Sequence, residues 1–263
     1  MIAKNLKIIR KEIDQAAVAC GRPSSEINLI GVSKKKPIEM IGEAFNSGLT
    51  EIGENYVEEF SDKESQYHPQ GLNYHFIGRL PTKKVRKIVG KVSLIHSVGS
   101  IKLAKKIDLV SSEENICQEV LIQVNQGSEW SKSGVDPGEL ENSFSEINEL
   151  SNIKIKGLMS IPPFHEPAKP YFVQLRNMRD TIQEKFDIKL PFLSMGMSGD
   201  FHEAISEGST HVRVGTAIFG LLIVLCSSNS FFSSSSPCNV IGSFSISYFH
   251  LACGGKDIKI ALT

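Results

Sequence analysis

Residues 29–37 read Leu-Ile-Gly-Val-Ser-Lys-Lys-Lys-Pro, and they contain the transition on which the fold depends. An apolar run over 27–32 meets three consecutive lysines, and Pro37 stands where a following helix would begin. A buried strand that ends in a lysine is how an α/β enzyme presents an amine to a ligand. Taken alone, the same residues describe a basic surface loop equally well, because most lysines are solvated. The remainder of the chain has to decide between these interpretations.

Apolar segments with strand spacing alternate with segments of helical spacing along the rest of the chain. One helix is expected in front of the first strand, and a helix is expected after every strand but the last. The expected strands cover 27–32, 49–53, 73–77, 93–98, 119–125, 154–161, 192–196 and 211–215. The expected helices cover 5–20, 37–46, 55–66, 81–89, 100–110, 137–150, 167–186 and 200–207.

This alternation predicts the fold class. Strands that alternate with helices are joined by right-handed crossovers in a parallel sheet. Eight such units close into a single (β/α)8 TIM barrel, here with an extra N-terminal helix, and a chain of 263 residues suits that fold. A doubly wound open sheet is the alternative, because periodicity does not specify the order of the strands.

Composition narrows the class of protein. The chain has 29 basic and 29 acidic residues, so its overall charge points neither to nucleic acid nor to an anionic membrane. Its five cysteines are odd in number and form no Cys-x-x-Cys pair, which indicates a reduced protein without a zinc site. Residues 1–10 are polar and do not resemble a signal peptide, so a cytoplasmic location is expected.

The chain changes character after Gly220. Residues 221–263 are rich in serine and carry only three charges, on Lys256, Asp257 and Lys259. We therefore expect two parts: a barrel over 1–220 and an atypical, nearly uncharged C-terminal extension over 221–263 that is poorly ordered. The β-prone, uncharged composition of this extension makes it an aggregation hazard where it is exposed.

Two short segments near the end of the expected barrel suggest a phosphate site. Barrel sites lie at the C-terminal ends of the strands, often with a phosphate held by the loops after strands seven and eight. Ser198 and Gly199 follow the seventh expected strand, and Gly215 and Thr216 end and follow the eighth. Small residues let backbone N–H groups approach a phosphate, and hydroxyls donate further bonds. Each segment alone is compatible with an ordinary turn, but both together at these positions favour a phosphate site.

A phosphate site opposite a lysine at the end of the first strand suits pyridoxal 5′-phosphate, because the lysine amine condenses with its aldehyde. Arg213, in the eighth strand, is then placed to face the pyridine nitrogen, where it would keep that nitrogen unprotonated; a salt bridge at the barrel end is its alternative role. His75 alternates with its neighbours so that it can point into the barrel, or it can be an ordinary core histidine. Asn55 can equally serve as a helix N-cap.

The expected helix over 81–89 is strongly basic. Its apolar side is supplied by Val85, Ile88 and Val89, and its charges come from Lys83, Lys84, Arg86, Lys87 and the nearby Lys91. A solvated surface is the simplest interpretation. Anion binding is the less favoured alternative, because no aromatic residues accompany the charges.

With these residues in view, the chain resembles the pyridoxal-phosphate homeostasis proteins, which are similar to the barrel domain of alanine racemase without its second domain. Ordered blocks that cover roughly residues 1–220 carry the resemblance, and this order makes it more specific than any single motif. The matching blocks are 32–37, 53–57, 75–78, 132–134, 157–162, 193–200 and 208–220.

The resemblance implies a barrel of PLP fold type III in which Lys34 is the Schiff-base lysine. The resemblance implies that the phosphate is held by Ser198, Gly199, Gly215 and Thr216. It places Arg213 beside the pyridine nitrogen, and Asn55, His75 and Met195 around the ring. It also implies a protein of intracellular vitamin B6 homeostasis without established catalytic turnover. We expect PLP-dependent apo-enzymes as acceptors of the cofactor, no nucleic-acid or membrane partner, no metal, and a monomer or weak dimer.

Two other functions stay open. One is a PLP-dependent, racemase-like enzyme, although racemases of this fold take a base from a second domain and nothing after Gly220 resembles one. The other is a binding module for anions or RNA, which the balanced charge disfavours.

Two features depart from the family: the serine-rich tail, and Lys35 where a small polar residue is common. If the first strand continued through the lysines, Lys34 and Lys36 would share one face and Lys35 the other.

Overall fold

The computed structural model describes residues 1–127, 133–220, 247–253 and 256–262. The chain divides into two compact units, Met1–Phe219 and Gly220–Thr263. In the second unit, strands β9 (Ser247–Cys253) and β10 (Lys256–Leu262) pair in antiparallel fashion. The prediction of a poorly ordered extension over 221–263 falls largely on residues outside those described, and it stays a prediction.

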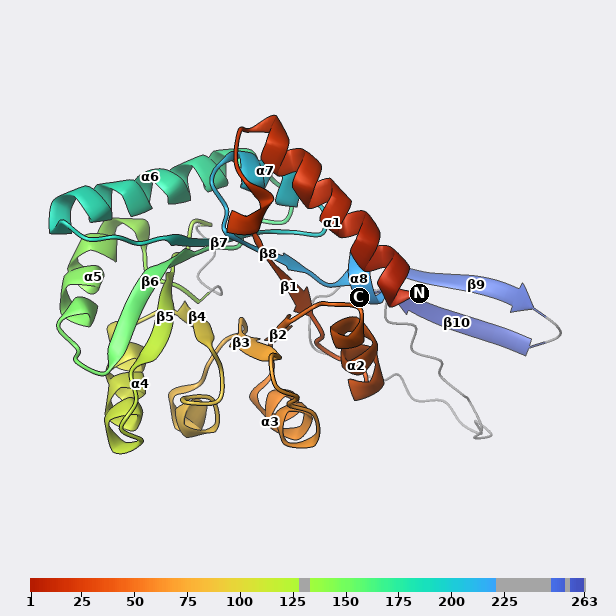
Figure 1. Cartoon of the computed structure of the whole chain (residues 1–263), viewed down its shortest axis with the longest axis horizontal. Helices are drawn as coiled ribbons and strands as arrows, with labels where there is room; N and C mark the ends of the chain where they lie inside the picture. Colours follow the sequence, from red (N-terminus) through yellow and green to blue (C-terminus); the bar gives the residue numbers. More distant parts are fainter. Residues whose placement is uncertain (128–132, 221–246, 254–255, 263) are drawn as a thin grey trace, which may run out of the picture. The chain divides into compact units, whose positions relative to one another are not determined.

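The first unit is a closed barrel of eight parallel strands, in the sequential order β1 to β8 (Figure 1). Closure is made by β1, which pairs with both β2 and β8. The predicted (β/α)8 barrel is confirmed, and the doubly wound open sheet is wrong. The strands are β1 (Asn28–Val32), β2 (Glu51–Glu54), β3 (Asn73–Phe76), β4 (Leu94–Val98), β5 (Gln118–Gln123), β6 (Ile153–Met159), β7 (Phe192–Met197) and β8 (His211–Val214).

Helices surround the barrel, and the predicted N-terminal helix is present as α1, which lies against α2, α7 and α8 (Figure 1). The α-helices are α1 (Ile2–Ala19), α2 (Ile38–Asn46), α3 (Val57–Gln66), α4 (Ile101–Glu113), α5 (Leu140–Asn148), α6 (Lys169–Phe186), α7 (Phe201–Ser206) and α8 (Thr216–Phe219). Three short 3₁₀ helices complete the set: η1 (Ser24–Glu26), η2 (Thr82–Lys87) and η3 (Pro137–Glu139).

The structure corrects two expectations about helices. The segment after β3 is the 3₁₀ helix η2 and not an α-helix. Its buried anchors, Val85 and Ile88, are three residues apart, which matches the three residues per turn of a 3₁₀ helix, and Gly90 follows at a φ of +76°. The last strand is also followed by a helix, the four-residue α8.

The core has two parts. A large apolar cluster fills the space between the strands and the surrounding helices. A second, small apolar cluster is made by Leu94, Leu121 and Met159 with Phe192 packed against it. Buried polar side chains of the strands lie in the barrel interior, among them His75, His96, Ser194, His211 and Arg213. This polar interior lies directly beneath the ends of the strands where the candidate site is found.

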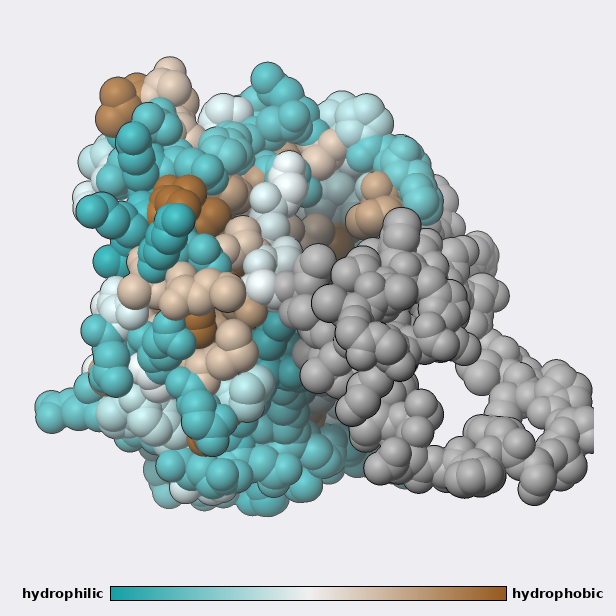
Figure 2. Space-filling view, turned by 90° about the vertical axis from the view of Figure 1, so that its right-hand side faces the viewer, coloured by the Kyte–Doolittle hydropathy of each residue, from teal (hydrophilic) through white to brown (hydrophobic). Residues whose placement is uncertain are grey.

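The surface of the described residues is mostly polar, in contrast to the apolar core. On the side shown in Figure 2, the described residues are mainly hydrophilic, with apolar residues in small groups between them. Among the described residues, none of the helices has the length and apolar character needed to cross a bilayer.

Candidate functional site

The first, seventh and eighth strands bring the predicted site residues together. In the strand register Ile30 lies beside Arg213, and Arg213 lies beside Met197 on β7. The C-terminal ends of β7, β8 and β1 are therefore neighbours at one edge of the barrel, as the closed order requires. The turn that contains Lys34 thus lies next to the loops that contain Ser198 and Thr216.

The three lysines sit in a turn and not on a strand. Strand β1 ends at Val32, and the N–H of Lys36 donates to the carbonyl of Ser33 at 2.9 Å. Lys35 has a φ of +58°. The condition under which Lys34 and Lys36 would share one face is therefore not met, because β1 ends before them and the chain turns at Lys35. Lys34 is exposed.

Lys36 has a different environment from its two neighbours. It is partly buried, and its Nζ donates to the carbonyl of Phe219 at 3.4 Å, at the end of α8. Burial lowers the pKa of the Lys36 amine below its ordinary value. This side chain therefore places a second cation between the lysine turn and the segment after β8.

A buried charge cluster anchors the lysine turn from behind. The ammonium group of Lys63, on α3, donates at 2.7 Å each to the carbonyl of Ser33, to Glu54 and to Glu59. The hydroxyl of Ser33 also donates to Glu54, and the N–H of Lys35 donates to Glu59. Lys63 is 7% exposed and Glu54 is fully buried, so this is an ion pair inside the protein. Burial raises the pKa of Glu54, against the opposing effect of Lys63 and Ser33.

The predicted phosphate-binding residues form one group. The hydroxyl of Thr216 donates to that of Ser198 at 3.3 Å, across the loops after β8 and β7. Gly215 packs on β1, where an added Cβ would lie 3.3 Å from the carbonyl of Val32. Among the described residues, the N–H groups of Ser198 and Gly199 make no backbone hydrogen bond. Because α7 and α8 have only six and four residues, these N–H groups and hydroxyls supply the donors, with little help from a helix dipole.

Arg213 is held by two hydrogen bonds beneath this group. It is 5% exposed, and it donates to Ser194 Oγ at 2.6 Å and to the carbonyl of Ser160 at 2.9 Å. Burial lowers its pKa to about 10, so the guanidinium remains a cation at neutral pH. The alternative role, a salt bridge at the barrel end, is not found among the described residues, because both partners are uncharged.

A chain of hydrogen bonds runs from Arg213 through the barrel interior. Ser194 Oγ lies 2.9 Å from His96 Nδ1, and His96 Nε2 lies 3.0 Å from His75 Nδ1. His75 Nε2 then lies 2.6 Å from a carboxylate oxygen of Glu51. His96 and Ser194 belong to β4 and β7, which are not neighbouring strands, so this contact crosses the interior.

The partners at the two ends limit how this chain can be bonded. Glu51 only accepts, so His75 Nε2 donates to it. The oxygen of Ser194 accepts from Arg213. Burial, and then the neighbouring His75, His211 and Arg213, hold the pKa of His96 well below its ordinary value, so the ring of His96 donates through one nitrogen and accepts through the other.

His75 points into the barrel, and it is also a buried histidine with partners at both ring nitrogens, so its role as a cofactor contact stays a prediction. It belongs to a buried group of three histidines, with ring centroids 5.2 Å from His96 and 6.2 Å from His211. Its neighbour Glu51 would have its pKa raised by burial, but hydrogen bonds from His75 and Asn73 lower it overall. Within the described part of the chain, no three His, Cys, Asp or Glu side chains are placed to hold a metal ion.

Two polar atoms at the strand ends have no partner among the described residues. Asn55 Oδ1, after β2, and Ser160 Oγ, after β6, are both buried without a hydrogen bond. A buried polar atom without a partner is costly, so such atoms mark places where a ligand or water completes the bonding. Asn55 does not cap α3, whose N-cap residue is Tyr56, so its predicted alternative role is wrong.

Met195 lies apart from the other predicted residues. Its side chain is fully buried in the apolar cluster outside the strands, together with Val212 and Val214. It faces away from Ser194, its neighbour on β7, which points into the barrel. The Met195 side chain therefore presents no surface to a ligand. The sequence could not predict this, because it does not reveal which way each residue of β7 faces.

Sequence reasoning did not find Lys63, Ser194 or His96 as parts of the site. Lys63 lies four residues after Glu59 on one helix, a spacing that predicts an ion pair but not its burial. Ser194 and His96 each lie in an apolar strand, and only the closed barrel brings them into contact.

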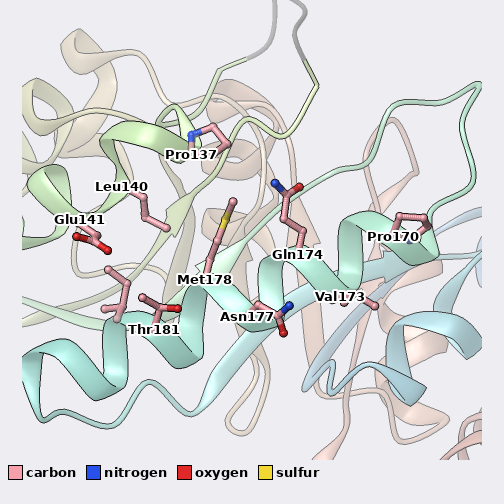
Figure 3. Close-up of a pocket in the computed structure, with 10 residues that line it drawn as sticks. Pro137, Leu140, Glu141, Pro170, Val173, Gln174, Asn177, Met178 and Thr181 are labelled. Atoms are coloured by element: carbon pink, nitrogen blue, oxygen red, sulfur yellow. The ribbon is translucent and has the colours of Figure 1, made fainter.

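A separate groove of about 350 Å³ lies outside the barrel, between α5 and α6 (Figure 3). Leu140, Val173 and Met178 supply apolar lining, and the predicted site residues do not contribute to it. The candidate site is therefore the barrel edge and not this groove.

Comparisons with known proteins find related sequences over most of the chain. Residues 4–222 match the family model described as "Alanine racemase, N-terminal domain". The chain is 45% identical over 220 residues to the pyridoxal phosphate homeostasis protein of Aquifex aeolicus, which covers 82% of this chain and 96% of that protein. It is 38% identical over 227 residues to the protein of the same name from Escherichia coli K12, covering 83% and 96%.

Solved structures show the same fold. PipY of Synechococcus elongatus, in a structure with PLP bound, has a TM-score of 0.75 at 33% identity and covers 84% of this chain and all of that one. Alanine racemase of Clostridium difficile has a TM-score of 0.66 at 17% identity, covering 87% of this chain and 59% of that one, which shows likeness of fold alone.

Proposed function

The chain belongs to the family of pyridoxal phosphate homeostasis proteins, and from that membership we propose that it holds pyridoxal 5′-phosphate at the barrel edge, on Lys34. It serves intracellular PLP homeostasis as a carrier, without catalytic turnover of its own. The observation that carries the proposal is that Lys34, Ser198 and Thr216 follow the C-terminal ends of three neighbouring strands of a closed barrel, with Arg213 on one of these strands.

The residues present fit the cofactor. Ser198, Gly199, Gly215 and Thr216 offer hydroxyl and N–H donors of the kind a phosphate requires. The unpartnered Asn55 Oδ1 and Ser160 Oγ give the site polar atoms that a ligand can satisfy. When bound, the cofactor supplies an aldehyde that a lysine amine binds as a Schiff base. The side chain of Met195 faces the outer apolar cluster, so we do not propose it as a contact of the cofactor.

The chain's own residues prepare this site in three ways. Lys63 and Glu54 hold the turn before Lys34 in place through Ser33. Ser194 and Ser160 hold the Arg213 guanidinium, a permanent cation that disfavours protonation of a ring nitrogen beside it. His96, which burial keeps neutral, supports Ser194 from the interior and is itself bonded to His75.

The names of the relatives support a role in PLP homeostasis, and a carrier is the form of that role proposed here over a racemase-like enzyme. The likeness to alanine racemase is one of fold, and this chain spans 59% of that protein. We further propose that the cofactor passes to PLP-dependent apo-enzymes, and that the protein works in the cytoplasm as a monomer or weak dimer.

Absorbance spectroscopy tests the proposal. The purified protein with added PLP is expected to show the visible band of a protonated Schiff base, and borohydride reduction followed by peptide mass mapping should place the label on Lys34. Lys34→Ala should abolish the band, whereas the matched control Lys35→Ala, which alters an exposed neighbour, should retain it. A label on Lys36, or no band in the unaltered protein, would overturn the assignment.

A further inference from the structure

A second pocket lies on the same face of the barrel, at the ends of β3, β4 and β5. Its volume is about 740 Å³, and its wall is made by the start of η2, by the turn between β4 and α4, and by Ser133 and Gly134. None of the residues assigned above to the cofactor lines it. It is large enough for a small organic ligand, since such sites measure roughly 300–1,000 Å³.

Among the described residues, the charged side chains that line this pocket are all positive. They are Arg79, Lys83 and Lys102, and the described lining contains no acidic residue. Within the described part of the chain, these three cations take part in no salt bridge or side-chain hydrogen bond. A concentration of cations without nearby carboxylates attracts an anion, and a concave wall strengthens the field.

The other basic residues of the same region are neutralised. Lys84 pairs with Glu58 at 2.7 Å, and Lys87 reaches the same carboxylate at 3.7 Å. Arg86 pairs with Glu113 and Glu114 on α4. The basic segment over 81–91 is thus divided: its outer side is a solvated, paired surface, and the side towards the pocket keeps its positive charge.

The pocket also offers hydrogen-bond donors. Ser97 lines it, is 4% exposed, and has a buried Oγ without a partner among the described residues. Ser100 lines it as the N-cap of the 13-residue helix α4, whose first turn contains no acidic residue. The free N–H groups of a helix N-terminus and the positive end of its dipole both favour an anion.

Two segments of the pocket wall pack against each other through their backbones. A Cβ added to Gly99 would lie 2.9 Å from the nitrogen and 3.0 Å from the Cα of Gly134, so the two backbones touch. Gln123 holds the second segment by donating to the carbonyl of Ser133 at 2.7 Å. The wall is therefore fixed by contacts that do not involve the three cations.

From these observations we propose that this pocket is a second anion-binding site, which takes the phosphate group of a small phosphate monoester through Arg79, Lys83 and Lys102, with Ser97 and the start of α4 as donors. It is separate from the Lys34 site and does not depend on the proposed function. A ligand held here lies on the same barrel face as the cofactor site, because both are at the C-terminal ends of the strands.

Calorimetric titration of the full-length protein tests the proposal, with glycerol 3-phosphate as the probe. The Lys34 site is first blocked by binding and reducing PLP. The unaltered protein is expected to bind one further equivalent. Arg79→Gln combined with Lys102→Gln should weaken this binding by about 100-fold, since each charged hydrogen bond lost costs about a factor of ten. The matched control Lys84→Gln with Lys87→Gln removes the same charge from the paired side and should leave binding within a factor of two.

Another variant and an alternative way to disable the Lys34 site complete the test. Ser97→Ala removes a hydroxyl that has no partner, so it should leave folding intact and weaken glycerol 3-phosphate binding several-fold. Equal weakening by both pairs of substitutions would show general charge attraction and overturn the site, as would no binding at millimolar probe. If PLP does not attach to Lys34, the titration is run with Ser198→Ala and Thr216→Val in place of the block, so that failure of the proposed function and failure of this site give different results.

Discussion

The ammonium group of Lys63 lies 2.7 Å from the carboxylate of the fully buried Glu54. The two residues come from α3 and β2, and both also bind Ser33, the residue before Lys34. The second carboxylate oxygen of Glu54 has no partner among the described residues. The lysine turn is therefore supported by an ion pair that depends on both members being present.

Lys63→Met should lower the free energy of unfolding by about 3–5 kcal/mol, because it leaves the Glu54 charge buried and unpaired. Urea unfolding measures this change. Lys63→Met combined with Glu54→Gln should recover part of the loss, since the uncompensated charge is gone. A double variant less stable than the single one would contradict this account.

Ser194→Ala should destabilise the protein by about 1–3 kcal/mol, because it removes a partner from both the Arg213 guanidinium and His96 Nδ1. Ser65→Ala, at an exposed serine that bonds its own helix, is the control and should change stability by less than about 0.5 kcal/mol. Thermal unfolding of the two variants makes the comparison. Equal stability of both would show that the interior hydrogen-bond chain contributes nothing.

Stability should fall as the pH drops below about 6.5. Burial, with the neighbouring His75 and Arg213, lowers the pKa of His211 to about 3, and it holds the pKa of His96 well below the ordinary value. Between these values and about 6.5 the unfolded chain binds protons that the folded protein does not. Each histidine therefore removes about 1.4 kcal/mol of unfolding free energy per pH unit. Urea titrations from pH 7 to 5 measure the slope, and His96→Gln should reduce it by one histidine's share. A flat profile would contradict the neutral assignment.

Lys35→Asn should stabilise the protein by up to about 1 kcal/mol, because Lys35 has a φ of +58°, a conformation that asparagine adopts more readily than lysine. Lys11→Asn is a suitable control, since Lys11 is exposed within α1, where asparagine is a poorer helix former. Chemical unfolding should show opposite signs for the two substitutions. Destabilisation by both would show that the turn is not strained at Lys35.

Ser198→Ala with Thr216→Val should weaken PLP binding by about tenfold for each lost hydroxyl bond to the phosphate. The Lys34 band should still form at saturating cofactor, because the lysine turn is unchanged. Ser206→Ala, at an exposed hydroxyl on α7 that bonds Glu203, should leave the affinity unaltered. Titration followed by absorbance separates these outcomes, and unchanged affinity in the double variant would remove the two residues from the phosphate site.

Much of the fold and part of the site could be predicted from local pattern. The alternation of strand and helix spacing gave the eight strands within a few residues, and their number indicated the barrel. The position of Lys34 and of the small residues after β7 and β8 followed from the rule that barrel sites lie at strand ends. The 3₁₀ form of η2 and the turn at Lys35 did not, because helix type and strand length depend on which side chains the neighbouring elements bury.

The sequence by itself therefore determined the number and order of the strands and which lysines and small residues follow them, since periodicity and the order of the blocks are local properties of the chain. Only the tertiary structure decided which of those residues meet. Closure of β1 on β8 makes the end of β1, which precedes Lys34, a neighbour of the strand end that precedes Thr216. The closed interior joins His96 to Ser194 across 98 positions of sequence. It also turns Met195 outwards and buries Lys63 against Glu54. The physical reason is that burial and hydrogen bonding between distant segments arise only when the ring of strands closes.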